Sequence, residues 1–215
     1  MRIVGGQFRG RRLSAPAGQD TRPTADRTRE ALFNILKAHG LPETTTTVLD
    51  AFAGTGALGL EALSRGAGQA VFFETGRTAL TCLEANIASL GVEPQSRIFR
   101  RDVTRPPPCH QPAALLFLDP PYHQGLAPPA LLALAHHGWL APQALVVVET
   151  AHAETALASA LAFEAPLAAA GFILQEQRRY GPASLHFLRY IPPGPPVVVP
   201  PGRDASGAEH RPPAD

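Results

Sequence analysis

Residues 119–122 have the composition needed to hold a planar amine while it is alkylated. They read Asp-Pro-Pro-Tyr and directly follow an unbroken apolar run, 113–118, which predicts a buried strand. The lone pair of a nucleobase amine is delocalised into the ring, so methylation needs acceptors that hold both N–H groups while the nitrogen becomes tetrahedral. The carboxylate of Asp119 and the carbonyl of Pro120 are suitable acceptors, Pro121 stiffens the turn, and Tyr122 offers a ring on which an extruded base can stack. The alternative is a rigid turn whose aspartate caps the next helix.

A glycine-containing loop follows an earlier predicted strand, 46–50. It runs from Asp50 to Gly59 and contains a formal G-x-G-x-x-G, a weak fingerprint of dinucleotide binding. In dinucleotide binders the glycines directly follow the strand, so that a helix N-terminus receives the pyrophosphate, whereas here Asp50 stands four residues before Gly54. A carboxylate at that place would repel phosphates. It suits a cationic ligand such as S-adenosylmethionine, which carries an ammonium and a sulfonium and no phosphate.

Acidic residues follow or end the predicted strands. They are Asp50, Glu74, Asp102, Asp119 and Glu149. Parallel α/β sheets bind ligands at the carboxyl ends of their strands, and buried carboxylates need partners, so we expect several of these acids to meet hydroxyls, amines or N–H groups of a ligand. Glu74 is placed for ribose hydroxyls. Capping of the following helices is the alternative for each acid taken singly.

The histidines and cysteines do not indicate a metal site. The eight histidines show no H-E-x-x-H or similar spacing, and two cysteines, Cys82 and Cys109, cannot supply the four ligands of a structural zinc site. No Ser-His-Asp or Cys-His set can be assigned. The sequence therefore predicts chemistry without a metal.

Short apolar strands alternate with helical patterns around these residues. Strands are predicted at 46–50, 70–74, 97–101, 113–118 and 144–149, and helices at 56–65, 77–90 and through 131–135. Runs that are buried on both faces and separated by helices predict a doubly wound, Rossmann-like α/β fold with a mostly parallel sheet. Two further runs, 172–179 and 184–190, are joined by Gly181-Pro182 and predict a closing antiparallel hairpin.

Charge is distributed unevenly along the chain. Residues 1–37 carry eight Arg or Lys and three Asp or Glu, a net charge of +5, whereas the remainder carries eleven and fifteen, a net charge of −4. A basic arm on a mildly acidic body is typical of proteins that bind a phosphate backbone. Arg9, Arg11 and Arg12, which flank Gly10, are the candidate RNA-binding residues. A solvated arm without a ligand is the alternative.

Composition divides the chain into three parts. We predict a basic arm and a helix over 1–40, a catalytic domain over 41–191, and a disordered tail over 192–215, where eight prolines and three glycines leave little apolar surface to bury. No long apolar run follows the first residues, and prolines and histidines interrupt the uncharged stretch 120–148. We therefore expect a cytoplasmic protein without a membrane span, acting as a monomer.

Four segments together resemble the RsmD family. They are Thr21–Asn34, Val48–Gly56, Glu61–Ala67 and Asp119–Tyr122. The first and third, which include Arg-Pro-Thr and Ser-Arg-Gly-Ala, narrow the resemblance beyond methyltransferases in general. Members of this family are bacterial methyltransferases that modify N2 of one guanine in 16S ribosomal RNA with S-adenosylmethionine. The likeness runs from Met1 to about Tyr190 and leaves only the tail uncovered.

The resemblance implies a role for each matching position. The first cofactor loop corresponds to Asp50, Phe52, Gly54, Thr55 and Gly56, the ribose-binding acid to Glu74, and the residue near the adenine amine to Asp102. Arg22, Pro23 and Thr24 match a segment that folds over the methionine end of the cofactor, and Asp119, Pro120, Pro121 and Tyr122 match the catalytic loop. The implied partner is 16S ribosomal RNA or the small ribosomal subunit during its assembly.

Other functions share parts of this pattern. A DNA amino-methyltransferase also carries Asp-Pro-Pro-Tyr but usually has a target-recognition region, for which this chain has no space. A protein glutamine methyltransferase usually has Asn where Asp119 stands. A non-catalytic RNA-binding Rossmann module could use the basic arm, but it would not need acids at successive strand ends.

Overall fold

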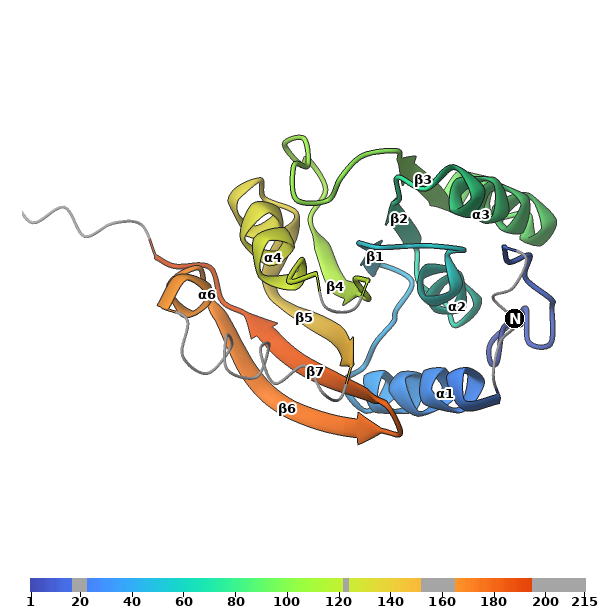
Figure 1. The fold of residues 1–215 in the computed structure, drawn as a ribbon, viewed down its shortest axis with the longest axis horizontal. Helices are drawn as coiled ribbons and strands as arrows, with labels where there is room; N and C mark the ends of the chain where they lie inside the picture. Colours follow the sequence, from blue (N-terminus) through green and yellow to red (C-terminus); the bar gives the residue numbers. More distant parts are fainter. Residues whose placement is uncertain (17–22, 122–123, 152–164, 195–215) are drawn as a thin grey trace, which may run out of the picture.

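A mixed sheet of seven strands forms the centre of the protein in the computed structural model, which describes residues 1–16, 23–121, 124–151 and 165–194 (Figure 1). The strands are β1 Thr47–Asp50, β2 Gln69–Phe73, β3 Ser96–Phe99, β4 Ala113–Leu118, β5 Leu140–Ala151, β6 Phe172–Tyr180 and β7 Ala183–Tyr190. Their spatial order is β3-β2-β1-β4-β5-β7-β6. The first five pair in parallel, and β7 is antiparallel to both neighbours. The predicted doubly wound sheet with a closing hairpin is confirmed.

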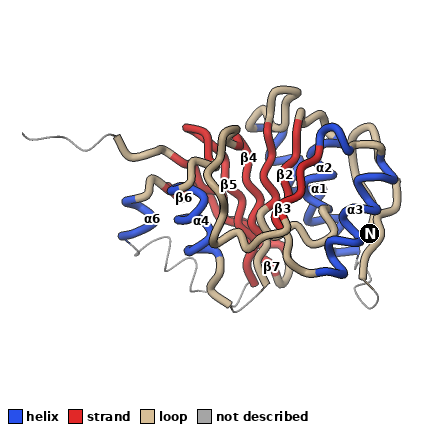
Figure 2. The backbone as a smooth tube through the Cα atoms, turned by 90° about the horizontal axis from the view of Figure 1, so that it is seen from above, coloured by secondary structure: helices blue, strands red, loops and turns tan. Residues whose placement is uncertain are grey.

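Helices cover both faces of the sheet, as Figure 2 shows. They are α1 Pro23–Ala38, α2 Ala57–Ser64, α3 Arg77–Leu90, α4 Ala127–His136 and α6 Ala165–Ala169, with a 3-10 turn at Glu93–Gln95. The first three pack on one face, where the rings of Phe33 and Phe117 lie 5.7 Å apart. The other two pack on the opposite face, around Leu131 and Trp139. Among the described helices, none is long and apolar enough to cross a membrane.

The strand order reverses between β1 and β4, and this places the functional loops. From β1 the chain proceeds outward through β2 to β3, and β4 then returns to the other side of β1. In the register of these pairs, Asp50 lies beside Phe117 and Leu118 beside Val148. The carboxyl ends of β1, β2, β4 and β5 therefore lie along one edge of the sheet, at the switch point where such folds bind ligands.

The basic arm folds against the helices that cover one face of the sheet. Ile3 N–H donates to the carbonyl of Arg11 at 2.9 Å, and Leu13 N–H donates to the carbonyl of Met1 at 2.9 Å, which makes residues 1–13 a small hairpin. The side chains of Ile3 and Leu13 are buried in the core beneath α1, α2 and α3. The division into arm, domain and tail stays a prediction, and most of the predicted tail, from residue 195, lies outside the described residues.

Two elements differ from the sequence expectation. Strand β5 begins at Leu140 rather than at 144, because its register against β4 shifts between Ala113 and Leu115 and Gln143 adopts a left-handed φ of 66°. Such a bulge interrupts the run of apolar residues from which the strand was predicted. The five residues of α6 were not predicted as a helix, because one turn and a half is too short to show helical periodicity.

Candidate active site

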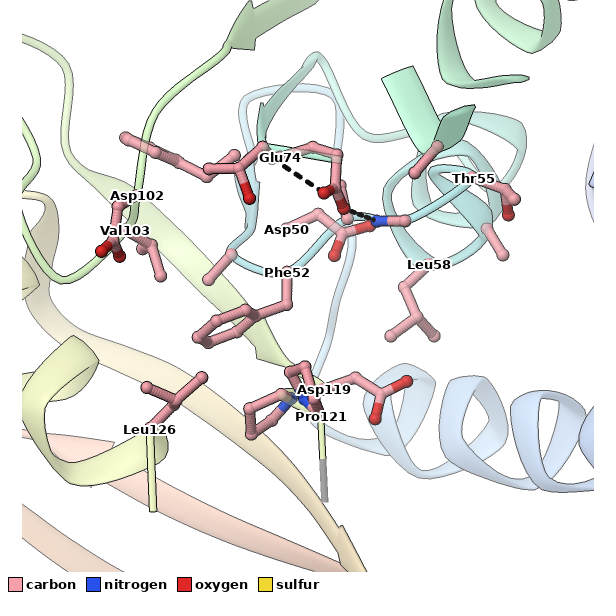
Figure 3. A pocket seen from close by; sticks show the side chains of 18 of the residues that line it. Asp50, Phe52, Thr55, Leu58, Glu74, Asp102, Val103, Asp119, Pro121 and Leu126 are labelled. Carbon is pink, nitrogen blue, oxygen red and sulfur yellow. Dashed lines mark hydrogen bonds between the residues drawn. The ribbon is translucent and has the colours of Figure 1, made fainter. Parts of the chain in front are cut away.

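A cleft of about 810 Å³ opens at the carboxyl edge of the sheet, between the loops that follow β1, β2, β3 and β4 (Figure 3). Its size suits a ligand of cofactor dimensions, since such pockets measure about 300–1,000 Å³. The predicted residues that line it are Asp50, Phe52, Gly54, Thr55, Glu74, Asp102, Asp119, Pro120 and Pro121. Arg22 and Tyr122 lie outside the described residues, while Pro23 and Thr24 begin α1. The structure thus brings together residues that are up to 71 positions apart in the chain.

The first loop turns sharply at two glycines. Gly54 and Gly56 have φ values of 54° and 80°, in the left-handed region that glycine enters without strain. A Cβ at Gly56 would also lie 2.4 Å from the Cδ1 of Leu83. Gly56 does not itself line the cleft, but it starts α2, so that Ala57 and Leu58 form part of the cleft wall.

Asp50 is buried at the end of β1 and serves the fold as well as the cleft. Its Oδ2 accepts a hydrogen bond of 2.9 Å from Gly59 N–H, in the first turn of α2. Burial raises the pKa of this carboxyl from 3.8 to about 7, against the opposing effect of the Gly59 N–H, and the charge of Glu74 raises it further. Asp50 therefore changes its charge near neutral pH, and a cation arriving beside it would favour the ionised form.

Glu74 holds the glycine loop in place. Its Oε2 accepts a hydrogen bond from Gly54 N–H at 2.7 Å (Figure 3). Its Oε1 accepts from Thr75 N–H at 2.8 Å and from Gly76 N–H at 2.7 Å. A carboxylate can accept about four hydrogen bonds, so Oε2 keeps the capacity to accept one from a ligand hydroxyl. Glu74 thus both shapes the loop and faces the cleft.

Asp119 extends toward the cleft from the loop after β4 (Figure 3). Asp119 is exposed to the cleft, and desolvation by the neighbouring protein raises the pKa of its carboxyl above the ordinary value. The charges of Glu149 and Asp50 raise it further. Pro120 behind it is buried. An acceptor with a raised pKa, held on a stiff turn, can orient an amine and take a proton from it.

Asp102 lies on the loop that follows β3, together with Val103. Its Oδ1 accepts hydrogen bonds from the backbone N–H and the hydroxyl of Thr104, both at 2.8 Å. Both of these bonds use the same carboxylate oxygen. The predicted position near an adenine amine is therefore on a well-defined turn at the cleft.

Sequence reasoning missed Asn86, which links the basic arm to the first cofactor loop. The buried amide donates to the carbonyls of Thr55 and Ser14, both at 3.0 Å, and its Oδ1 accepts from Ser14 N–H at 2.6 Å. Met1 and Pro16, which belong to the same arm, line the cleft. A signal was present in the sequence, because Asn86 falls three residues after the buried Leu83 and four before the buried Leu90.

The comparisons with known proteins agree with this geometry. Residues 1–188 match a family model described as Conserved hypothetical protein 95. Ribosomal RNA small subunit methyltransferase D of Escherichia coli K12 is 40% identical over 150 residues, which cover 70% of this chain and 74% of that protein. This chain belongs to the RsmD family of methyltransferases.

Further RsmD-family proteins and a solved structure extend the match. The methyltransferase D of Haemophilus influenzae is 38% identical over 154 residues, covering 70% of this chain and 78% of the relative. The solved structure of YhhF from Escherichia coli is 34% identical with a TM-score of 0.72, covering 90% of this chain and 99% of that one. The chain is therefore a methyltransferase with the Rossmann-like fold of its relatives.

The three arginines predicted to bind RNA lie on the exposed arm of this RsmD-family chain, away from the cleft. Arg9, Arg11 and Arg12 are exposed, and Nη2 of Arg11 donates to the carbonyl of Ser89 at 2.5 Å. Helix α3 borders the cleft at Ala79, ten residues before Ser89, a separation of about 15 Å along the helix. The structure does not bring these arginines together with the acids of the cleft.

Proposed function

We propose that this RsmD-family methyltransferase transfers the methyl group of S-adenosylmethionine to the exocyclic N2 of one guanine in 16S ribosomal RNA. The observation that carries the proposal is the position of Asp119 and its two prolines on the same cleft as the first cofactor loop. The relatives named small subunit ribosomal RNA methyltransferases support the choice of substrate. The reaction would take place in the cytoplasm.

The residues around the cleft fit S-adenosylmethionine. The carboxylate of Asp50 can face its ammonium group, Oε2 of Glu74 can accept from a ribose hydroxyl, and Asp102 can accept from the adenine amine. The resemblance adds Arg22, Pro23 and Thr24 at the methionine end. When bound, the cofactor supplies an electrophilic methyl group on its sulfonium.

The proposed mechanism is direct transfer without a covalent enzyme intermediate. The Asp119 carboxylate and the Pro120 carbonyl accept hydrogen bonds from the two N–H groups of the amine. The nitrogen lone pair is then directed at the methyl group as the nitrogen becomes tetrahedral. The bond from carbon to nitrogen forms while the bond from carbon to sulfur breaks. The methylated nitrogen is strongly acidic and gives its extra proton to Asp119 or to water. Catalysis comes from positioning and from acceptors matched to the transition state.

The substrate is proposed to be the RNA or the small subunit during its assembly, bound by a monomer. A methyltransferase acting on another RNA or on a DNA base would use the same cleft, and a glutamine side chain has a planar amide of similar shape. A module that binds RNA without catalysis would need none of the cleft acids. The experiment below separates these functions.

Methyl transfer from labelled S-adenosylmethionine should be measured with protein-free 16S RNA, small ribosomal subunits, DNA and protein as acceptors. We expect label in the RNA, recovered as N2-methylguanosine after digestion. Asp119→Ala should abolish turnover and leave cofactor affinity within a few fold. Glu93→Ala, at an exposed site on the 3-10 turn, is the matched control and should behave as wild type. Label in DNA or protein alone, or full activity of Asp119→Ala, would remove the assignment.

A further inference from the structure

Asp119, the first residue after β4, lies next to Glu149 near the carboxyl end of the parallel strand β5. In the ladder between β4 and β5, Leu116 lies beside Val146 and Leu118 beside Val148. Asp119 and Glu149 directly follow this last pair. Neighbouring strands are about 4.8 Å apart, so the two backbones hold the two carboxyl groups within reach of one small planar molecule.

Glu149 belongs to the face of the sheet that α1 and α2 cover. Val147, two residues before it in β5, is buried in the core of that face, and Asp119 is the first residue after β4. Side chains two positions apart on a strand point to the same face. The two carboxyl groups also interact electrostatically, because the negative charge of Glu149 raises the pKa of Asp119. Glu149 is half-buried, whereas Asp119 opens to the cleft.

The end of β5 is held rigidly. Glu149 lies beside Leu185 of β7 in the antiparallel ladder. On the opposite face of the sheet, the next residue, Thr150, has its hydroxyl 3.1 Å from Nε2 of His186, and both side chains are buried. A carboxylate on a paired strand is positioned more accurately than one on a loop, as discrimination between similar bases requires.

Guanine presents a distinctive edge to such a pair of acids. Its N2 amine and its N1–H are adjacent donors, whereas adenine places a ring-nitrogen acceptor beside its amine. An ionised carboxylate can only accept hydrogen bonds. One carboxylate can therefore accept from the N2 amine while its neighbour accepts from N1–H. In a purine whose N1 is unprotonated, the N1 lone pair would face a carboxylate oxygen, and the two acceptors would repel each other.

We propose that Glu149 accepts the N1–H of the guanine whose N2 amine is held by Asp119 and Pro120, and that Glu149 thereby selects guanine. This inference rests on the proposed function and names a specificity residue for it. Glu149 also interacts within the protein, which is compatible with this role because a carboxylate accepts about four hydrogen bonds. Among the described residues, no group of three or more His, Cys, Asp or Glu side chains is placed to hold a metal ion.

The test replaces the N1–H of the target base and the carboxylate of Glu149 in turn. An RNA substrate with 2-aminopurine at the target position keeps the 2-amine but carries a lone pair on N1. Wild type should methylate it at least a hundredfold less efficiently, by kcat/KM, than the guanine substrate. In Glu149→Gln the new amide N–H can donate to that lone pair. The preference for guanine over 2-aminopurine, as a ratio of kcat/KM values, should therefore fall at least tenfold. Comparing ratios between enzymes cancels the effect of the missing O6.

Two control variants make every outcome decisive. Glu93→Gln should keep the wild-type ratio. Glu149→Asp keeps the negative charge, but its side chain is one methylene shorter, so the carboxylate lies farther from the base. We expect it to methylate guanine more slowly and still to prefer guanine over 2-aminopurine. A folded Glu149→Gln with the wild-type ratio would overturn the inference. If Glu149→Gln does not fold, unchanged guanine turnover by Glu149→Asp would overturn it instead. If wild type forms no N2-methylguanosine, the proposed function has failed, which is a separate result.

Discussion

At the scale of single residues, three acids of the cleft, Asp50, Glu74 and Asp102, also accept hydrogen bonds from nearby backbone N–H groups. Glu74 is the clearest case, since three backbone N–H groups donate to its carboxylate. The position of Glu74 at the end of a predicted parallel strand indicated that it would face a ligand, but it could not indicate these hydrogen bonds. They depend on how the loop from Asp50 to Gly56 folds back over β2, which no local pattern encodes.

Glu74→Gln should weaken S-adenosylmethionine binding about tenfold or more. Glutamine has only one oxygen to accept the N–H groups of Gly54, Thr75 and Gly76, and hydrogen bonds to charged groups contribute about 1.5–3 kcal/mol each. Isothermal titration of the cofactor measures the loss. Glu84→Gln, on the exposed side of α3, serves as the control, and equal affinity of both variants would contradict the assigned role.

Asp50→Asn should stabilise the fold at alkaline pH while weakening cofactor binding. The folded-state pKa of Asp50, about 7, lies above its ordinary value of 3.8, so the folded state holds the proton more tightly and stability is lost as pH rises from about 4 to 7. Asparagine does not ionise and can still accept from Gly59 N–H. Its advantage should grow to at most about 4 kcal/mol, at ~1.4 kcal/mol per pKa unit. Denaturant unfolding at pH 5 and pH 8 tests this, and an advantage independent of pH would contradict it.

At the scale of elements, the first cofactor loop is held from two sides, by Glu74 and by Asn86. The Asn86 amide joins the loop to the basic arm through Thr55 and Ser14. The arm is also fixed by Glu61, a fully buried acid of α2 that accepts from Val4 N–H at 2.8 Å and from Nε of Arg65 at 2.7 Å. Order in the arm and order in the cofactor loop are therefore coupled.

Asn86→Ala should lower both stability and cofactor affinity. It removes the partner of the Ser14 backbone and leaves the carbonyl of the buried Thr55 unsatisfied, which costs about 1–3 kcal/mol for that buried group. We expect a lower Tm and a KM for S-adenosylmethionine raised about tenfold, with kcat changed far less. Thr81→Ala, at an exposed position of the same helix, should change neither. A lower Tm with an unaltered KM would limit Asn86 to a structural role.

The elements themselves were largely predictable, and the misses have physical causes. Strands buried on both faces are continuous apolar runs, so β4 was located to the residue, and so was α3, where Gly91 ends the helix with a φ of 68°. The order of the strands was not predictable in detail, because it depends on contacts between distant segments. Glu61 was missed for the same reason, because its partner Val4 lies 57 residues away in the chain. Asn86 was missed although its spacing from Leu83 and Leu90 placed it on the buried side of its helix.

At the scale of the whole molecule, part of the basic charge of the arm region is already used inside the protein. Arg29 is buried, donates to Asp26 at 2.8 Å and lies 3.7 Å from Glu61, and Arg2 pairs with Asp26 at 3.1 Å. Arg29 is therefore not available to a phosphate backbone, and Arg2 already has an acidic partner. Arg9, Arg11 and Arg12 are the exposed remainder on the arm hairpin.

Changing Arg9, Arg11 and Arg12 together to alanine should weaken RNA binding and leave cofactor affinity nearly unchanged. Each phosphate neutralised on a single strand contributes ~0.7 to the slope of log affinity against log salt, so the slope should flatten by about two units if all three make contact. Stability should change little, because only Arg11 bonds the body of the protein through its side chain, at Ser89. RNA affinity at several salt concentrations, measured beside thermal unfolding, tests this.

The matched control for the arm lies on the far edge of the sheet, where two arginines are held by their own strand and turn. Arg178 donates to Glu176 at 2.6 Å, and Arg179 donates to the carbonyl of Gly181 at 3.4 Å. Changing both to alanine should leave the salt slope as in wild type, because they lie on the edge strand β6, away from the arm. If the folded arm variant keeps the wild-type slope, the arm is not part of the RNA-binding surface. If the control flattens the slope equally, the attraction comes from overall charge and not from the arm.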